Sequence, residues 1–238
     1  MLRVGVIGLR DIGNLHADCY QSSPHARVVA VCDIIPERAD AAAARLGVPA
    51  YYDMHEMLER EKLDIVDVST GGVERGSDHY APTMAAFEAG CHVLCEKPIS
   101  NDIGQAREMV AKAAEKGLCF GINLNYRFSP ACQQAKQWIE EGWIGEINFA
   151  NKVQWIGSTG DTEWYHMRAL HPHSMDVLRF LCGEAVEMHS YMKRQPGSVC
   201  WTNASINILF ASGAIGHLNG SYDMTRLHPM ERTEIAGT

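Results

Sequence analysis

Short, continuously apolar runs alternate with helical patterns in the first half of the chain. The apolar runs cover residues 3–8, 27–33, 64–69, 91–95 and 118–123, and the helical stretches cover 13–22, 36–46, 53–61, 78–89 and 101–116. Strands that are apolar throughout are typical of a sheet buried on both faces. Strand–helix–strand repetition predicts a parallel, doubly wound α/β sheet with right-handed crossovers.

The pattern changes after residue 123. Helices are expected at 130–141 and 171–182, and strands at 145–156, 186–194, 200–210 and 213–222, with a polar loop at 157–163. Consecutive strands with short links predict an open, mostly antiparallel sheet. We therefore expect an α/β domain over 1–123 and an α+β domain over 124–238. Because a strand begins at Arg232 and the chain stops at Thr238, we expect either residues missing at the C-terminus or a very short edge strand.

Composition excludes several classes of partner. The net charge is -8 without a dense Lys/Arg cluster, which argues against nucleic acid and anionic membrane surfaces. The eight cysteines are scattered without a C-x-x-C pair, which favours reduced thiols, and the N-terminus has no apolar signal region. No stretch reaches the roughly 20 apolar residues of a membrane helix. We therefore expect a cytoplasmic protein.

A glycine turn follows the first strand. Residues 8–13 read G-L-R-D-I-G, so Gly8 and Gly13 match the first and third glycines of a dinucleotide fingerprint and Arg10 replaces the second. Asp33 ends the second predicted strand, where an acidic side chain can accept hydrogen bonds from ribose hydroxyls. Arg38 is near enough to reach a 2′-phosphate, but Asp33 would repel that group. The turn predicts a nicotinamide dinucleotide, NAD in preference to NADP.

Four segments in order resemble the glucose–fructose oxidoreductase and inositol dehydrogenase family, Gfo/Idh/MocA. They are the turn extended to His16, the A-G-x-H-V-x-x-E-K-P signature, an N-x-R-F segment and an H-x-x-D stretch, at residues 8–16, 89–98, 125–128 and 173–176. The resemblance covers nearly the whole chain. It implies a Rossmann domain followed by a sheet domain, hydride transfer between a sugar or cyclic polyol hydroxyl and a nicotinamide cofactor, and assembly as a homodimer or homotetramer.

The expected chemistry centres on Lys97. It follows a buried strand at the carboxyl end, where ligands of such sheets bind, and its ammonium can stabilise a developing alkoxide. His173 is the expected proton acceptor, with Asp176 on the same helix face. Many relatives carry Asp where this chain has Ala169, so His171 is a second relay candidate.

The predicted catalytic residues are therefore Lys97, His173, Asp176 and His171, and no bound metal is expected. The predicted cofactor-binding residues are Gly8, Arg10, Asp11, Ile12, Gly13, Asp33, Arg38, Ser69, Thr70, His79, Glu96, Lys97 and Arg127. Two alternatives stay open: an NAD-dependent glycosidase that uses transient oxidation, and a non-catalytic dinucleotide-binding regulator. Arg10 and Ala169, which depart from the fingerprint and from the family pattern, are the reason to retain the regulator as an alternative.

Overall fold

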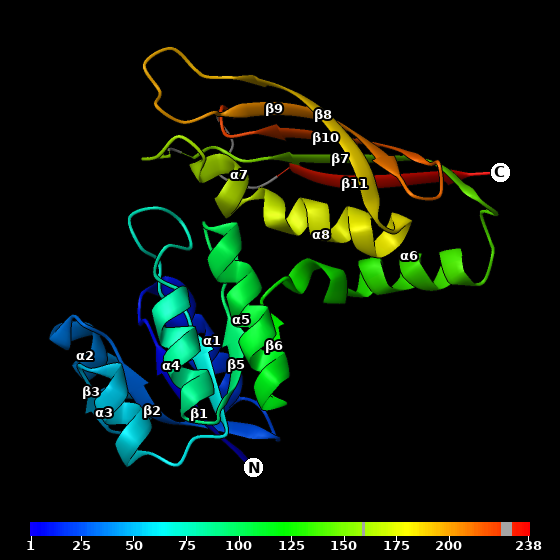
Figure 1. Ribbon diagram of the computed structural model, residues 1–238. Helices are drawn as coiled ribbons and strands as arrows, with labels where there is room; N and C mark the ends of the chain where they lie inside the picture. Colours follow the sequence, from blue (N-terminus) through cyan, green and yellow to red (C-terminus); the bar gives the residue numbers. More distant parts are fainter. Residues whose placement is uncertain (159, 225–229) are drawn as a thin grey trace. The chain divides into compact units, whose positions relative to one another are not determined.

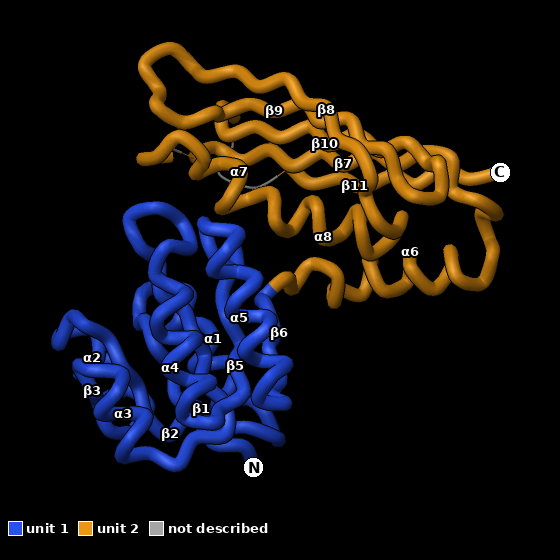
Figure 2. Tube along the Cα trace, in the orientation of Figure 1, with its two compact units in different colours: residues 1–123 blue, residues 124–238 orange. Residues whose placement is uncertain are grey.

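The structure is a computed structural model that describes residues 1–158, 160–224 and 230–238. The chain forms two compact units, Met1–Asn123 and Leu124–Thr238 (Figure 2). The first contains a parallel sheet and the second a mixed, mostly antiparallel sheet. Both sheet types agree with the fold class that the alternation of apolar runs predicts.

The first unit is built on a parallel sheet of six strands in the order β3-β2-β1-β4-β5-β6 (Figure 1). The order reverses direction at β1, which is the topological switch point where ligands of doubly wound sheets bind. The strands are β1 (Leu2–Ile7), β2 (Ala26–Cys32), β3 (Ala50–Tyr51), β4 (Ile65–Val68), β5 (His92–Cys95) and β6 (Phe120–Ile122).

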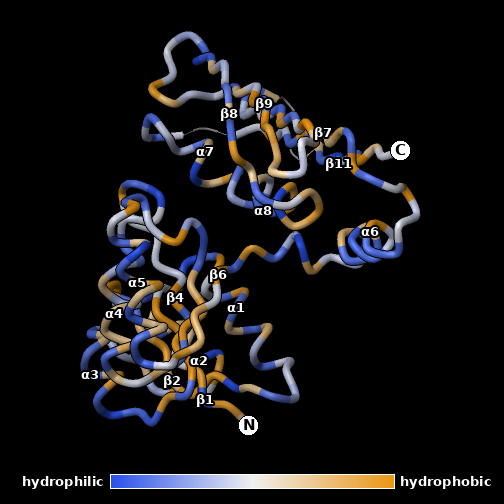
Figure 3. Tube along the Cα trace, turned by 45° about the vertical axis from the view of Figure 1, so that its right-hand side comes forward, coloured by the Kyte–Doolittle hydropathy of each residue, from blue (hydrophilic) through white to orange (hydrophobic). Residues whose placement is uncertain are grey.

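Five helices connect these strands. They are α1 (Asp11–Gln21), α2 (Pro36–Leu46), α3 (Met54–Arg60), α4 (Tyr80–Glu88) and α5 (Ile103–Lys116). Pro36 occupies the first turn of α2, and Gly47 ends that helix with a φ of 69°, a left-handed conformation that favours glycine. The strands of this unit are largely hydrophobic (Figure 3). The two-residue strand β3 is too short to leave a hydrophobic pattern, and the sequence did not predict it.

The second unit packs helices on one face of a five-stranded sheet with the order β11-β7-β10-β9-β8 (Figure 1). All neighbouring strands are antiparallel except β7 and β10. Its strands are β7 (Ile147–Trp155), β8 (Ala185–Lys193), β9 (Asn203–Phe210), β10 (Ile215–Ser221) and β11 (Met230–Gly237).

The helices of the second unit are α6 (Pro130–Glu140), α7 (Tyr165–Ala169) and α8 (His171–Cys182), preceded by a 3₁₀ turn, η1 (Asn125–Phe128). Leu178 and Leu181 of α8 share a core with Ile206, Ile208 and Leu218 of the sheet. The sequence did not predict α7 or η1, since a single turn is too short to show a helical period. The packing of α8 fixes which side chains of its first turn lie against the sheet.

Candidate functional site

The carboxyl edge of the first sheet gathers most of the predicted cofactor residues. Hydrogen bonds of the strand ladder continue one residue past each strand end, so the residues that follow are held rigidly. The amide nitrogens of Gly8, Ser69, Glu96 and Asn123 donate to the carbonyl oxygens of Cys32, Ile7, Val68 and Cys95 at 2.8–2.9 Å. Thr70 and Lys97 come next in the chain. The edge is therefore a fixed platform and not a set of mobile loop residues.

The glycine turn fits the close approach of a phosphate-bearing ligand. Gly8 has a φ of 94°, and a Cβ there would lie 2.7–2.8 Å from backbone atoms of Ser69 and Thr70. A Cβ on Gly13 would overlap the carbonyl oxygen of Gly8. Arg10 has φ -77° and ψ -165°, a conformation open to any residue. The first and third glycines are thus required by the packing of the turn itself, and the second position is not.

The residues after Gly8 lead into α1. Arg10, Asp11 and Ile12 are exposed at the start of that helix. The free backbone N–H groups of a first helical turn attract anions such as a pyrophosphate. This turn and helix start would hold the phosphates of a dinucleotide.

Asp33 is buried at 6% exposure directly after β2. Its Oδ2 accepts the Leu9 amide hydrogen at 2.7 Å, and its Oδ1 accepts that of Ile35 at 2.9 Å. The Arg38 guanidinium lies 4.0 Å away and is largely exposed. The carboxylate therefore holds the glycine turn in place, and its remaining lone pairs are available as hydrogen-bond acceptors.

Lys97 follows Glu96 at the end of β5, and the Lys97–Pro98 peptide bond is cis. The pKa of Lys97 is lowered overall. Burial and the positive charge of Arg75 lower it, and they outweigh the negative charge of Glu96, which raises it. A half-buried ammonium with a lowered pKa is a stronger hydrogen-bond donor and proton source than a surface lysine.

His79 connects the two loops that flank this edge. Its Nδ1 lies 2.7 Å from the carbonyl oxygen of Pro98, and its Nε2 lies 2.6 Å from that of Thr70. The side chain is buried, and burial lowers its pKa. Because both ring nitrogens face backbone carbonyls, the ring braces the loops after β4 and β5, and we assign His79 a positioning role beside the site.

In the second unit, His173 lies in the first turn of α8 and stacks on Tyr126 of η1. The ring centroids are 4.2 Å apart and the planes differ by 11°. His173 and Asp176 are both buried. Pro172 occupies the first turn of α8, where a missing N–H has no cost. The stacked ring fixes the orientation of the His173 imidazole.

Asp176 forms a bidentate ion pair with Arg127. The Arg127 Nε donates to Oδ2 at 2.7 Å, and its Nη2 donates to Oδ1. The Asp176 hydrogen bond raises the already high pKa of Arg127. The guanidinium also lies 5.2 Å from the Phe180 ring. The sequence placed Arg127 among the cofactor-binding residues; here it forms a structural salt bridge that engages both oxygens of Asp176.

His171 belongs to a buried chain of hydrogen bonds. His166 Nδ1 lies 3.0 Å from the Trp201 carbonyl oxygen and therefore carries a hydrogen. Its Nε2 lies 3.0 Å from Nε2 of His171, which must donate. Nδ1 of His171 lies 3.1 Å from the oxygen of the Ser174 hydroxyl, whose hydrogen goes to Gln154 Oε1. A Cβ on Gly220 would overlap the His171 ring. Buried contacts thus hold both imidazoles in place, which is a structural arrangement.

Acidification is expected to destabilise the second unit because of this pair. Burial lowers the pKa of His166 to about 4. Burial, together with the positive charges of His166 and Lys152, lowers the pKa of His171 to about 3. Below a pH of about 6.5, His166 and His171 bind protons in the unfolded chain but stay neutral in the folded chain. As the pH falls below about 6.5, each histidine should lower the free energy of unfolding by about 1.4 kcal/mol per pH unit. Above a pH of about 6.5 this loss of stability should be absent.

Tryptophan fluorescence can isolate this effect, since every tryptophan of the chain lies in the second unit: Trp138, Trp143, Trp155, Trp164 and Trp201. Urea unfolding followed by this signal at several pH values is the measurement. His171→Asn should give a shallower dependence, and His25→Asn, at an exposed position, should leave it unchanged. An unfolding midpoint that is constant between about pH 6.5 and 5 would contradict the neutral pair.

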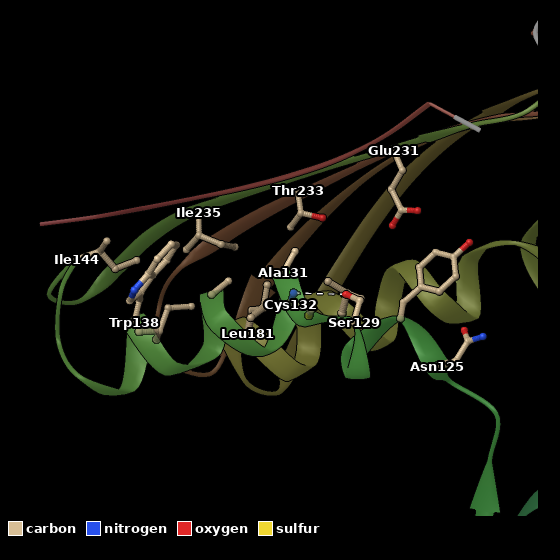
Figure 4. Close-up of a pocket in the computed structure, with 14 residues that line it drawn as sticks. Asn125, Ser129, Ala131, Cys132, Trp138, Ile144, Leu181, Glu231, Thr233 and Ile235 are labelled. Carbon is tan, nitrogen blue, oxygen red and sulfur yellow. Dashed lines mark hydrogen bonds between the residues drawn. The ribbon is translucent and has the colours of Figure 1, made fainter. Parts of the chain in front are cut away.

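A pocket of about 830 Å³ lies in the second unit between α6, α8 and β11 (Figure 4). Asn125 and Glu231 line its polar end, and Trp138 and Ile144 its apolar end. Glu231 also pairs with the buried ammonium of Lys152. None of the predicted catalytic residues lines this pocket.

Among residues 1–158, 160–224 and 230–238, no three or more His, Cys, Asp or Glu side chains are grouped as metal ligands. Within the same residues, no helix is both long enough and apolar enough to cross a membrane.

Comparisons with known proteins place these sites in a family. Residues 2–124 match the family model described as "Oxidoreductase family, NAD-binding Rossmann fold", and residues 132–238 match the "GFO/IDH/MocA C-terminal domain". D-glucoside 3-dehydrogenase of Escherichia coli is 36% identical over 61% of this chain and 41% of its own length. D-apiose dehydrogenase of Paraburkholderia graminis is 26% identical over 98% of this chain and 64% of its own length.

The chain thus spans less than two thirds of the length of these two relatives. The scyllo-inositol 2-dehydrogenase (NAD(+)) of Bacillus subtilis is 29% identical over 100% of this chain and 72% of its own length. A solved levoglucosan dehydrogenase, in complex with NADH and levoglucosan, superposes with a TM-score of 0.89 at 25% identity, covering 100% of this chain and 71% of that one. With family models matching both units, the chain belongs to the Gfo/Idh/MocA oxidoreductase family, and its first unit is an NAD-binding Rossmann fold.

Proposed function

We propose that the protein transfers hydride between a hydroxyl-bearing carbon of a sugar or cyclic polyol and NAD. The observation that carries the proposal is the platform at the carboxyl edge of the first sheet, where the Gly8 turn, Asp33 and Lys97 follow β1, β2 and β5 of the same parallel sheet. The relatives, which include D-apiose, scyllo-inositol and levoglucosan dehydrogenases, support this substrate class.

The residues of the platform fit a nicotinamide dinucleotide. The turn from Gly8 to Gly13 would hold the pyrophosphate, and the Asp33 carboxylate would accept the adenosine ribose hydroxyls. The same carboxylate would repel a 2′-phosphate, so we propose NAD in preference to NADP. When bound, the cofactor supplies the hydride acceptor for alcohol oxidation.

Lys97 and His173 divide the proton chemistry in this proposal. The Lys97 ammonium donates a hydrogen bond to the substrate hydroxyl oxygen and stabilises the negative charge that develops there. The His173 imidazole, oriented by its stack on Tyr126, accepts the hydroxyl proton. Asp176, held by Arg127, fixes the helix turn that carries His173, and His171 remains within its buried chain.

Net NADH formation from free sugars and polyols tests the proposal against its alternatives. A dehydrogenase accumulates NADH in proportion to the substrate consumed. A glycosidase that uses transient oxidation cleaves a glycoside without net NADH, and a regulator binds NAD without turnover. A panel of pentoses, inositols and anhydrosugars, each incubated with NAD and the protein, separates these outcomes.

We also propose that the outer face of the second sheet packs against a second copy of the chain. Phe149, Ile215 and Leu209 are register neighbours on three adjacent strands, and they are 44%, 55% and 39% exposed. They alternate with residues that face α8, so they share the opposite face. Such an apolar row on a monomer surface is typical of an interface. Sedimentation should give the mass of a dimer or tetramer, and a monomer mass would refute this assignment.

A further inference from the structure

A compact loop of residues 69–79 joins β4 to α4 at the carboxyl edge of the first sheet. The Thr70 hydroxyl donates to the Asp78 carbonyl oxygen at 2.7 Å and closes the loop at its base. Nearer the tip, the Gly76 amide donates to the Gly71 carbonyl oxygen at 3.2 Å. The loop is therefore folded back on itself by its own hydrogen bonds, and its residues have fixed places at the edge.

This loop packs against the turn that follows β5. Gly76 is buried, with a φ of 86°, and a Cβ at this position would lie 2.8 Å from Cγ of Pro98. The His79 ring, whose two nitrogens face one carbonyl oxygen from each side, holds the loop and the turn together. Arg75 and Lys97 are the residues immediately before the two that touch, Gly76 and Pro98. The packing therefore places Arg75 close to Lys97.

Arg75 adds a second positive charge beside Lys97, and the sequence did not predict it as a site residue. Its side chain is half-buried. Burial is the largest cause of the lowered pKa of Lys97, and the charge of Arg75 lowers that pKa further. The same charge acts on His79, whose pKa is lowered mainly by burial. Two positive charges held close together repel each other, and an anion beside them would relieve that repulsion.

The carboxylates of this region leave Arg75 without a counter-charge. The charge of Glu96, which is buried directly before Lys97, acts on the Lys97 ammonium. Glu74 and Asp78 belong to the loop itself, and Asp78 is exposed. Across the part of the chain that the structure describes, neither these carboxylates nor any others form an ion pair with the Arg75 guanidinium. Its planar set of N–H donors is therefore available to a ligand.

We propose that Arg75 binds a carboxylate of the substrate while Lys97 faces the reacting hydroxyl of the same molecule. Sugar acids, such as aldonates and uronates, are then better substrates than neutral sugars of the same shape. A guanidinium suits this task because its paired N–H groups match the two oxygens of a carboxylate. The anion site stands on the geometry of the first unit alone, and its effect on turnover rests on the proposed function.

The phosphates of the dinucleotide are a second source of negative charge, and the topology of the sheet argues against them. The glycine turn follows β1, whereas the loop of residues 69–79 packs on the turn after β5. In the sheet, β4 lies between β1 and β5. Arg75 thus lies on the side of the loop that faces away from the glycine turn and toward Lys97. This placement favours the substrate as the source of the anion.

Matched pairs of sugars test the preference. D-Glucuronate and D-glucose differ only in a carboxylate against a CH₂OH group, and D-gluconate and D-glucitol differ in the same way. In each pair the acid should have the higher kcat/KM. Arg75→Gln should lower kcat/KM for the acid by about 10- to 100-fold, as expected for a hydrogen bond to a charged group, and change that for the neutral sugar little. Arg75→Lys should keep part of the preference, since the charge remains without the planar fork. Arg27→Gln, at an exposed arginine near the amino end of β2, should leave it unchanged.

Protection of Lys97 from acylation gives a readout that needs no turnover. With and without NADH, D-glucuronate should slow acylation of Lys97 more than D-glucose does, and Arg75→Gln should abolish the difference. The ratio of rates with and without sugar cancels any change that the variant makes in the reactivity of Lys97.

Three results would overturn the proposal. They are equal protection by both sugars, an equal loss of kcat/KM for both members of a pair in Arg75→Gln, and a loss of NAD affinity in that variant with the preference unchanged. The second would mean that Arg75 acts only through the charge of Lys97, and the third that it binds the dinucleotide. Protection that depends on Arg75 without NADH formation from any sugar would refute the proposed function and keep the anion site.

Discussion

Lys97→Met is expected to lower kcat by a factor of about 10²–10³, or about 3–4 kcal/mol, while NAD affinity changes little. Lys97 follows β5 at the edge where doubly wound sheets bind ligands, and its ammonium is half-buried beside Glu96. An ammonium in such surroundings stabilises an alkoxide far more strongly than it does in water. The measurement is steady-state NADH formation on a polyol that turns over, with NAD affinity titrated separately.

Two further variants sharpen this experiment. Lys97→Arg should restore little activity, since a planar guanidinium does not replace a compact ammonium at close range. Lys62→Met, at an exposed lysine that precedes β4 and so lies at the amino edge of the first sheet, opposite the carboxyl edge that carries the site residues, should keep normal kcat. If Lys97→Met keeps near-normal kcat, Lys97 is not catalytic, and His173 becomes the leading candidate.

Asp33→Asn is expected to weaken NAD binding by about 10- to 100-fold and to narrow the preference over NADP. The variant removes the charge that would bind ribose hydroxyls, and a hydrogen bond to a charged group contributes about 1.5–3 kcal/mol. It keeps the shape of the side chain and an acceptor oxygen for one of the two backbone amides, Leu9 or Ile35, which now donate to separate carboxylate oxygens. Fluorescence or calorimetric titration with each dinucleotide measures both affinities.

Asp33→Ser is the useful comparison, because it loses the carboxylate and cannot keep both backbone contacts. It should weaken NAD at least as much as Asp33→Asn and also lower the stability of the Gly8 turn. Arg38→Met should change NAD affinity little, since the Arg38 guanidinium lies 4.0 Å from Asp33 and is largely exposed. Tighter binding of NADP than of NAD by the unaltered protein would refute the role of Asp33.

The sequence predicted the elements that carry a long hydrophobic period. The helices α2 and α8 begin and end at the predicted residues, because proline in the first turn and glycine at the end mark both boundaries. The strands of both sheets appear within a few residues of their predicted ranges. The elements β3, α7 and η1 escaped prediction because each is held by neighbouring structure and not by its own pattern.

Residue type and position in the chain placed Asp33 and Lys97 at strand ends, but they did not reveal the hydrogen bonds that decide what each side chain does. The engagement of Asp176 by Arg127 is a contact between segments 49 residues apart. Asp67 shows the same limit: one carboxylate inside an apolar strand was visible in the sequence, but its partners His16 and Tyr20 come from α1. Long-range polar pairing leaves no period along the chain.

Transfer of deuterium from a labelled polyol to NAD tests the central claim most directly. A substrate from the panel, deuterated at its hydroxyl-bearing carbons, is incubated with NAD and the unaltered protein, and the reduced cofactor is analysed by mass spectrometry. The account predicts reduced cofactor that carries one deuterium, formed in step with the oxidised sugar and nearly absent with Lys97→Met. Tight NAD binding without any labelled cofactor, across a panel that covers pentoses, inositols and anhydrosugars, would contradict it.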